Sequence, residues 1–149
     1  MSVHESAIRW QRNLHEADAS TYSRNHQVIL NGGQQLNVSA SAEFKGDASC
    51  ADPEQMLVSA VSSCHMLFFL AIAEFQGYQV ESYHDDPVGH LERNDRKGME
   101  VTRIVLSPRI TFGGDNMPNQ DAISRIHAGA HRNCFIRNSI TAEVSINHS

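Results

Sequence analysis

The chain has 149 residues, a formal net charge of -5 and a sequence pI near 5.9. This length predicts one domain, residues 1–149, with enough chain to bury a core without disulfide bonds. The sequence has no cluster of Lys and Arg, which argues against a nucleic-acid partner, because neutralising phosphates requires a basic patch. Three widely spaced cysteines and an N-terminus without a charged-then-apolar signal pattern predict a reducing, cytoplasmic location.

The N-terminal third predicts a small antiparallel sheet. Residues 8–12 form a weak strand pattern and residues 18–23 are polar, as in a turn. Residues 26–30 and 35–41 flank Asn31-Gly32-Gly33, which is a hairpin signal. Apolar and polar residues alternate along residues 35–41, so this strand is expected to bury one face.

A long helix follows, and its expected ends are well marked. Asp52 is a favourable N-cap, Pro53 suits the first helical position, and Gln55 can complete a capping box with Asp52. Gly77 is expected to end the helix in the left-handed conformation. About 23 residues at ~1.5 Å each give a helix of ~35 Å.

The middle of this helix is apolar nearly all round, from residue 56 to residue 73. A bilayer span takes ~20 apolar residues, but the polar run Ser62-Ser63-Cys64-His65 would lie at mid-bilayer, where polar groups are costly. The sequence therefore predicts a core helix and no membrane partner. A helix apolar on most sides needs protein around it, so a homodimer is expected to supply the missing wall.

The second half predicts further strands and one shorter helix. Residues 78–83 and 139–146 read as single strands, and residues 88–92 and 100–112 as an antiparallel pair. Residues 118–132 have helical spacing. The order of strands, long helix, strands, helix and strand is an α+β plan. The expected core residues of this half are Val101, Ile104, Leu106, Ile110, Phe112, Ile123, Ile126, Ala130, Ile140, Ala142, Val144 and Ile146.

Two thiols are the main chemical feature of the sequence. Cys64 lies in the most apolar stretch, and Cys134 follows the second predicted helix, which is the layout of a two-cysteine redox site. The alternative is that Cys64 is a small apolar core residue, although its polar neighbours weigh against this. A thiol reacts as thiolate and has a free pKa of ~8.5, so a cation or donor is required nearby. The candidates are Arg24, Lys45, Arg132 and His65.

Two further residues have competing interpretations. Glu54 precedes Cys64 by ten residues, or ~15 Å along a straight helix. If both act in one site, Glu54 must come from a partner chain or the helix must break; otherwise Glu54 only complements the helix dipole. Cys50 precedes the helix in a loop and is expected to be incidental.

A metal site is a weaker interpretation. His127 and His131 have i, i+4 spacing and Cys134 follows three residues later, a pattern that can bind zinc. However, no Glu follows His127 and a fourth ligand would have to come from elsewhere, so no metal is expected.

Two segments resemble the osmotically inducible protein C and organic hydroperoxide resistance (OsmC/Ohr) family. They are Asp52-Pro53-Glu54-Gln55-Met56-Leu57, followed by Ser62-Ser63-Cys64-His65-Met66, and, more loosely, Ala130 to Asn138. The likeness covers residues 22–146 in element order. It implies an α+β fold with antiparallel sheets around a long buried central helix plus a second shorter helix, as an intertwined homodimer with sites at the interface.

The resemblance also implies a function. Cys64 would be the peroxidatic thiolate of a peroxiredoxin-like peroxidase that reduces organic hydroperoxides or hydrogen peroxide, and Cys134 would resolve its sulfenic acid as a disulfide. Arg24 matches the family's peroxide-polarising arginine, held by Glu54; in another branch the cation occupies the place of Lys45. His65 would support the site. No cofactor is implied, only an external dithiol or lipoylated-protein reductant.

This chain departs from the family pattern at Asp52, where Asn is usual, and at Phe135, where Pro often follows the second cysteine. A second hypothesis is therefore kept: a non-catalytic dimer that binds a small hydrophobic ligand or senses oxidation. Its pocket would be lined by Met56, Met66, Phe68 and Phe69.

Overall fold

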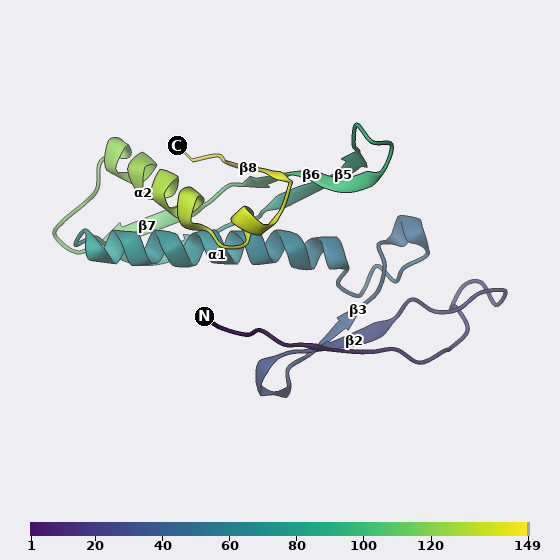
Figure 1. The fold of residues 1–149 in the computed structure, drawn as a ribbon. Coiled ribbons are helices and arrows are strands. Elements are labelled where there is room, and N and C mark those ends of the chain that lie inside the picture. Colours follow the sequence, from purple (N-terminus) through teal and green to yellow (C-terminus); the bar gives the residue numbers. More distant parts are fainter. Residues whose placement is uncertain (149) are drawn as a thin grey trace. The chain divides into compact units, whose positions relative to one another are not determined.

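The computed structural model describes residues 1–148 (Figure 1). The chain divides into two compact units, Met1–Met56 and the part from Leu57 onward, and each is described by itself below. A single domain over residues 1–149 stays a prediction. The fold is α+β, as the sequence predicts, with two α-helices and three small sheets.

The first unit contains a three-stranded antiparallel sheet. Its strands are β1 (Ala7–Arg9), β2 (His26–Ile29) and β3 (Gln35–Val38), in the order β1-β2-β3. The predicted hairpin is confirmed: Gly32 and Gly33 join β2 to β3 with φ of 71° and 72°. These are backbone conformations that glycine adopts without steric cost. Along β3 Val38 is fully buried but Leu36 is exposed, so the predicted buried face is covered only at one end.

Helix α1 (Pro53–Phe75) begins and ends where the sequence predicts. At its start the Gln55 main-chain N–H donates to the Asp52 carboxylate at 2.8 Å, and the Asp52 N–H donates to the Gln55 side chain at 3.0 Å. This is a reciprocal capping box. At its end Gly77 has φ of 84°, and Tyr78 N–H bonds the Ala73 carbonyl at 2.9 Å, which is the Schellman pattern.

The second unit combines two sheets with two helices. Strand β4 (Gln79–His84) pairs antiparallel with β7 (Arg109–Gly113). In the other sheet the order is β5-β6-β8, and its members are β5 (Val88–Arg93), β6 (Met99–Leu106) and β8 (Glu143–Ile146). The second helix, α2, is Gln120–Asn133 and lies alongside α1 (Figure 1). Asn119 caps it by accepting from the Ala122 N–H at 2.8 Å.

Two strand predictions need correction. The expected strand 100–112 is two strands, β6 and β7, which belong to different sheets. Pro108 lies between them, and proline cannot donate a main-chain hydrogen bond within a sheet. The expected strand 139–146 begins only at Glu143, because Arg137–Ser139 form a 3-10 turn, η3. Strand β8 runs parallel to β6, while the other strand pairs are antiparallel, as expected.

The core of the second unit consists of two apolar clusters on α1. In one, Val58 and Val61 pack against Ile104 and Leu106 of β6 and against Val144 of β8. In the other, α1 packs against α2, and its buried members are Phe69, Ala73, Ile126 and Ala130. The predicted core of this half is therefore confirmed at its centre.

Much of α1 nevertheless remains uncovered. By length and composition it could cross a membrane, with a mean hydropathy of 2.0, a test that the core helix of a soluble protein also passes. In its most apolar window 33% of residues are buried. Leu67 and Phe75 are 59% and 92% exposed. The helix therefore presents apolar surface that the single chain leaves open.

Gly89 of β5 gives a test of how closely this sheet packs on α1. A Cβ atom at position 89 would lie 2.4 Å from Val58 Cγ2, which is inside any permissible contact. We expect Gly89→Ala to lower the free energy of unfolding by about 1–3 kcal/mol, as overpacked cores do. The measurement is urea denaturation followed by circular dichroism.

The compensating variant is Val58→Ala, which removes the atom that the new methyl group would meet. Alone it should cost about 2 kcal/mol through a cavity. The double variant should cost less than the sum of the two single variants, because contacting residues couple. Strict additivity would show that the strand moves away from α1 instead.

Candidate active site

The structure brings the two predicted thiols together in the second unit. Cys64 lies on α1, and Cys134 is the residue at which α2 ends. The Cys64 thiol lies close enough to Cys134 to raise its pKa, and both cysteines are free. The Cys134 sulfur also lies 4.0 Å from the carbonyl oxygen of Val61, one turn before Cys64 on α1.

The two thiols differ in exposure. Cys134 is 1% exposed, whereas Cys64 is half-buried and is the one that a small molecule can reach. Burial raises the pKa of Cys134, an effect that a main-chain N–H of Arg137 partly opposes and that the neighbouring Cys64 reinforces. At neutral pH Cys134 therefore remains a thiol.

A short turn fixes the position of Cys134. After α2 the chain leaves the helix with ψ of 110° at Cys134 and then folds into η3. The Arg137 N–H donates to the Cys134 sulfur at 3.4 Å, and the Asn138 N–H donates to its carbonyl at 3.0 Å. The Asn138 side chain bonds the Arg132 carbonyl at 3.2 Å, which ties the turn to the end of α2.

Three imidazole rings form a row in the second unit, and two of them are buried. His65 Nε2 and His127 Nδ1 are 3.0 Å apart, joining α1 to α2, and the His127 ring contacts that of His148 at 4.4 Å between centroids. His65 and His127 are almost fully buried. Burial, with the neighbouring imidazoles, lowers the pKa of His65 to about 4 and that of His127 to about 3. His65 is thus a neutral hydrogen-bonding residue at neutral pH and supplies no positive charge to Cys64.

An acidic residue stands next to this row. Asp85 accepts a hydrogen bond from the Ser62 hydroxyl of α1 and one at 2.7 Å from the Ser107 N–H. Its charge favours protonation of His65, but desolvation of His65 is the larger effect. Ser62 therefore has a specific partner, although it lies on an otherwise apolar helix.

The arrangement of these side chains does not support the alternative of a zinc site. Within residues 1–148, no group of three or more His, Cys, Asp and Glu side chains is arranged to hold a metal ion. His127 bonds His65 instead, and the Cys134 sulfur accepts from the Arg137 N–H.

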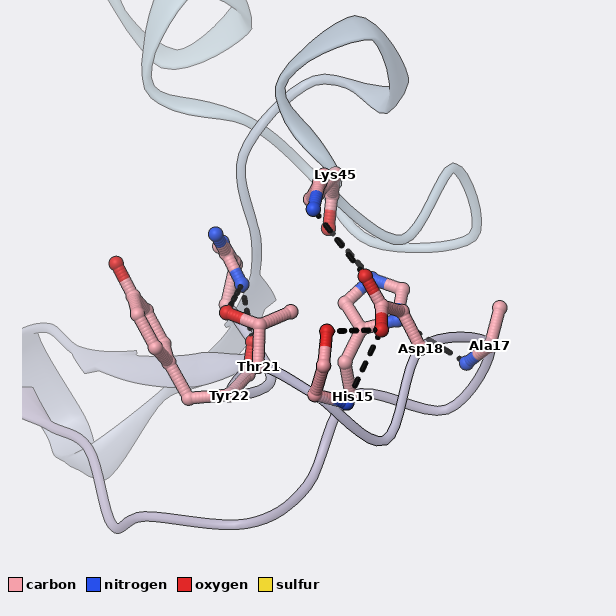
Figure 2. A network of polar contacts seen from close by, with 8 residues as sticks. His15, Ala17, Asp18, Thr21, Tyr22 and Lys45 are labelled. Carbon is pink, nitrogen blue, oxygen red and sulfur yellow. Dashed lines mark hydrogen bonds and ion pairs between the residues drawn. The ribbon is translucent and has the colours of Figure 1, made fainter.

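The candidate cations Arg24 and Lys45 both belong to the first unit. Figure 2 shows Lys45 beside Asp18. The Lys45 ammonium pairs with the Asp18 carboxylate at 3.2 Å, and His15 donates to the Lys45 carbonyl at 2.9 Å. Hydrogen bonds from Ser20, followed by that from Lys45, lower the pKa of Asp18 to about 2. The charge of Lys45 is therefore matched by a carboxylate.

Arg24 is held differently. Its guanidinium donates to the Thr21 hydroxyl at 3.2 Å and to the Tyr22 carbonyl, and it lies 4.0 Å above the Tyr22 ring. These partners are uncharged. Among the described residues Arg24 has no carboxylate within 4.0 Å, so its guanidinium is not part of an ion pair.

Two other predicted residues are also placed in the first unit. Glu54 is in the first turn of α1, which continues unbroken to Phe75, so the option of a helix break between Glu54 and Cys64 is removed. Burial, with the Asp47 carboxylate, raises the pKa of Cys50, which disfavours a reactive thiolate. The incidental role of Cys50 stays a prediction.

Sequence reasoning missed three residues near the thiols. Asp85 follows β4 and has no motif around it, and His148 lies near the C-terminus, far from the other histidines in sequence. Arg137 had a usable signal, because a residue three positions after a cysteine at a helix end can direct its N–H back to the sulfur.

An α+β chain in which two distant thiols meet between a long central helix and the end of a second helix is a candidate thiol-redox protein. The family model for OsmC-like proteins matches residues 46–149, and the chain belongs to this family. It is similar to an OsmC-like protein of unknown function from Vibrio cholerae, with 39% identity, a TM-score of 0.91 and 99% of both chains covered.

More distant structures share the fold. A protein from Legionella pneumophila, described as an organic hydroperoxide resistance protein and predicted redox protein, is 18% identical with a TM-score of 0.66 over 99% of this chain and 100% of that chain. An organic hydroperoxide resistance protein of Bacillus subtilis is 11% identical with a TM-score of 0.69, covering 98% and 97%. Among curated proteins none matches significantly.

The buried histidines predict a specific pH dependence of stability. Their pKa values in the folded state lie below the ordinary value of 6.5, so the unfolded chain binds more protons below that pH. Above pH 6.5 these histidines should not reduce the free energy of unfolding. The free energy of unfolding should fall as the pH is lowered from 6.5 toward 4. The slope is at most about 1.4 kcal/mol per pH unit for each histidine. Urea denaturation at several pH values measures it.

The matched variants are His127→Asn, which removes one buried titrating group, and His4→Asn, which changes an exposed histidine. His127→Asn should flatten the pH dependence, whereas His4→Asn should leave it as in the wild type. Equal slopes in both variants would contradict the assignment.

Proposed function

We propose that the chain is a thiol-dependent peroxidase that reduces organic hydroperoxides, and also hydrogen peroxide, with Cys64 as the peroxidatic and Cys134 as the resolving cysteine. The observation that carries this proposal is the contact between two free thiols of unequal exposure. Cys64 is exposed enough to react with the peroxide, and the buried Cys134 lies beside it as the second thiol. Membership of the OsmC-like family supports the same chemistry.

The reaction proceeds in three steps. The Cys64 thiolate attacks an oxygen of the peroxide, the O–O bond breaks, an alcohol leaves with a proton, and Cys64 becomes a sulfenic acid. The Cys134 sulfur then displaces hydroxide from Cys64, which gives a disulfide and, with the Cys134 proton, water. An external dithiol or lipoylated protein returns two electrons, and the protein itself needs no cofactor.

Arg24 is the better candidate for the cation that polarises the peroxide. Its partners are neutral, whereas the charge of Lys45 is matched by Asp18. Arginine also offers a planar fork of donors, which lysine lacks. Glu54 would hold this arginine in the active protein.

Apolar side chains near the thiols favour organic peroxides. Phe68, one turn after Cys64, meets Phe135 edge-to-face at 5.0 Å between centroids, and Phe135 is 70% exposed. Leu67 is exposed on the same turn of α1. The alkyl part of a hydroperoxide would gain contact with these residues, whereas hydrogen peroxide would not.

The first test is intact-protein mass spectrometry after one equivalent of cumene hydroperoxide. We expect the loss of two hydrogens and a peptide map that links Cys64 to Cys134. Cys64→Ser should abolish turnover, and Cys134→Ser should accumulate a sulfenic acid that dimedone traps. Arg24→Gln should slow peroxide consumption by about 10²-fold, on the scale of losing one charge-stabilising donor, and Lys45→Gln should leave it within about threefold of the wild type.

Unchanged thiols, or oxidation spread equally over all three cysteines, would reject this function. Equal peroxide decay by the wild type and Cys64→Ser would favour the second hypothesis of a ligand-binding or oxidation-sensing dimer. One residue of the pocket expected under that hypothesis, Phe69, is fully buried and cannot line an open pocket. Its ring packs against Tyr83, Phe112 and His127.

The proposal includes a homodimer. The exposed apolar residues of α1 need cover, and a partner chain could bring Glu54 near Cys64, which one straight helix cannot do. Light scattering should give twice the chain mass of 16.6 kDa. Leu67→Glu should shift the protein toward a monomer, whereas Glu81→Gln, on an exposed strand position, should not. A wild-type monomer at micromolar concentration would contradict the proposal.

The proposed setting is the cytoplasm, where a dithiol reductant is available and where the chain acts without nucleic-acid or membrane partners. The three unpaired cysteines and the acidic net charge are consistent with this setting. A fluorescent fusion retained at the membrane after cell fractionation would contradict it.

A further inference from the structure

Arg137 has no role in the reaction as described above. It is the charged residue of η3 and lies three positions after the resolving cysteine, Cys134. Its main-chain N–H donates to the Cys134 sulfur at 3.4 Å. Both cysteines and Arg137 lie in the second unit, whereas Arg24 and Lys45 belong to the first. Arg137 is therefore a charged residue whose main chain contacts the resolving thiol.

The Arg137 side chain is held without being neutralised. Its guanidinium donates to the Asn138 side-chain oxygen at 3.2 Å, and Asn138 is itself fixed by its bond to the Arg132 carbonyl. Asn138 is uncharged, and within residues 1–148 no carboxylate lies within 4.0 Å of Arg137. The charge reaches the end of α2, since it contributes to lowering the pKa of His131.

We propose that Arg137 is a positioning residue for the resolving step: its N–H bonds the Cys134 sulfur, and its charge, held on the same turn, favours the thiolate of Cys134. This rests on the proposed function and extends it to the second cysteine. Burial alone would leave Cys134 protonated and unreactive, because a thiol attacks only as thiolate.

The chemistry balances without a further reagent. The proton leaves Cys134, its thiolate displaces hydroxide from the Cys64 sulfenic acid, an S–S bond forms as the S–O bond breaks, and proton and hydroxide combine as water. During reduction of the disulfide the same N–H and charge would stabilise Cys134 whenever it is the sulfur that leaves.

The deciding experiment needs no peroxide. In a Cys50→Ser, Cys64→Ser background Cys134 is the sole thiol, and its ionisation is followed by thiolate absorbance across pH, a readout that does not depend on access to the buried sulfur. Arg137→Gln should raise the apparent pKa of Cys134 by about one unit, the lower end of the effect of a nearby opposite charge. Arg137→Lys should restore part of that shift.

The matched control is Arg125→Gln, which removes the same charge from an exposed position on α2, nine residues before Cys134. It should leave the Cys134 titration unchanged. Equal titrations for Arg137→Gln and the background protein, or equal shifts for Arg137→Gln and Arg125→Gln, would overturn the inference. Circular dichroism of each variant confirms that it folds.

A kinetic measurement shows which step of the reaction depends on Arg137. In Cys50→Ser protein Arg137→Gln should leave sulfenic acid formation at Cys64 unchanged and slow the following disulfide formation about tenfold, in line with the lower thiolate fraction. If no sulfenic acid forms even with Arg137 present, the peroxidase function fails, while the titration still decides the role of Arg137.

Discussion

The burial of α1 is the constraint on which the rest of this structure depends. A helix that is apolar on most of its surface must be covered, because exposed apolar surface is costly in water. One end of α1 is covered by β6 and β8, and the other by α2. The end of α2, and with it Cys134, is thereby brought against the turn of α1 that carries Cys64.

The polar residues in the middle of α1 follow from the same constraint. A buried polar group is costly unless it finds a hydrogen-bonding partner. Ser62 bonds Asp85 and His65 bonds His127, while Cys64 lies beside Cys134. Two side chains of the polar run that argued against a membrane helix therefore link α1 by hydrogen bonds to the segments packed around it.

The sequence predicted those parts of the fold that depend on local chemistry. The capping residues Asp52 and Gln55 and the terminating Gly77 marked the ends of α1 to within a residue or two, because caps are short-range interactions. The parallel pairing of β8 with β6 depends on long-range packing, which no local pattern records. In the site, the thiol pair was readable from Cys64 and Cys134. Asp85 and His148 were not, since only the folded chain makes them neighbours of Ser62 and His127.

Cys50 has a practical consequence of its own. The chain contains three cysteines, and Cys50 lies in a different unit from the other two. Once Cys64 and Cys134 are joined, Cys50 would be the single site at which a maleimide spin label or fluorophore could attach. The oxidised protein thus offers a native position for a reporter group, from which distances between the first unit and a probe placed elsewhere could be measured without engineering a new cysteine.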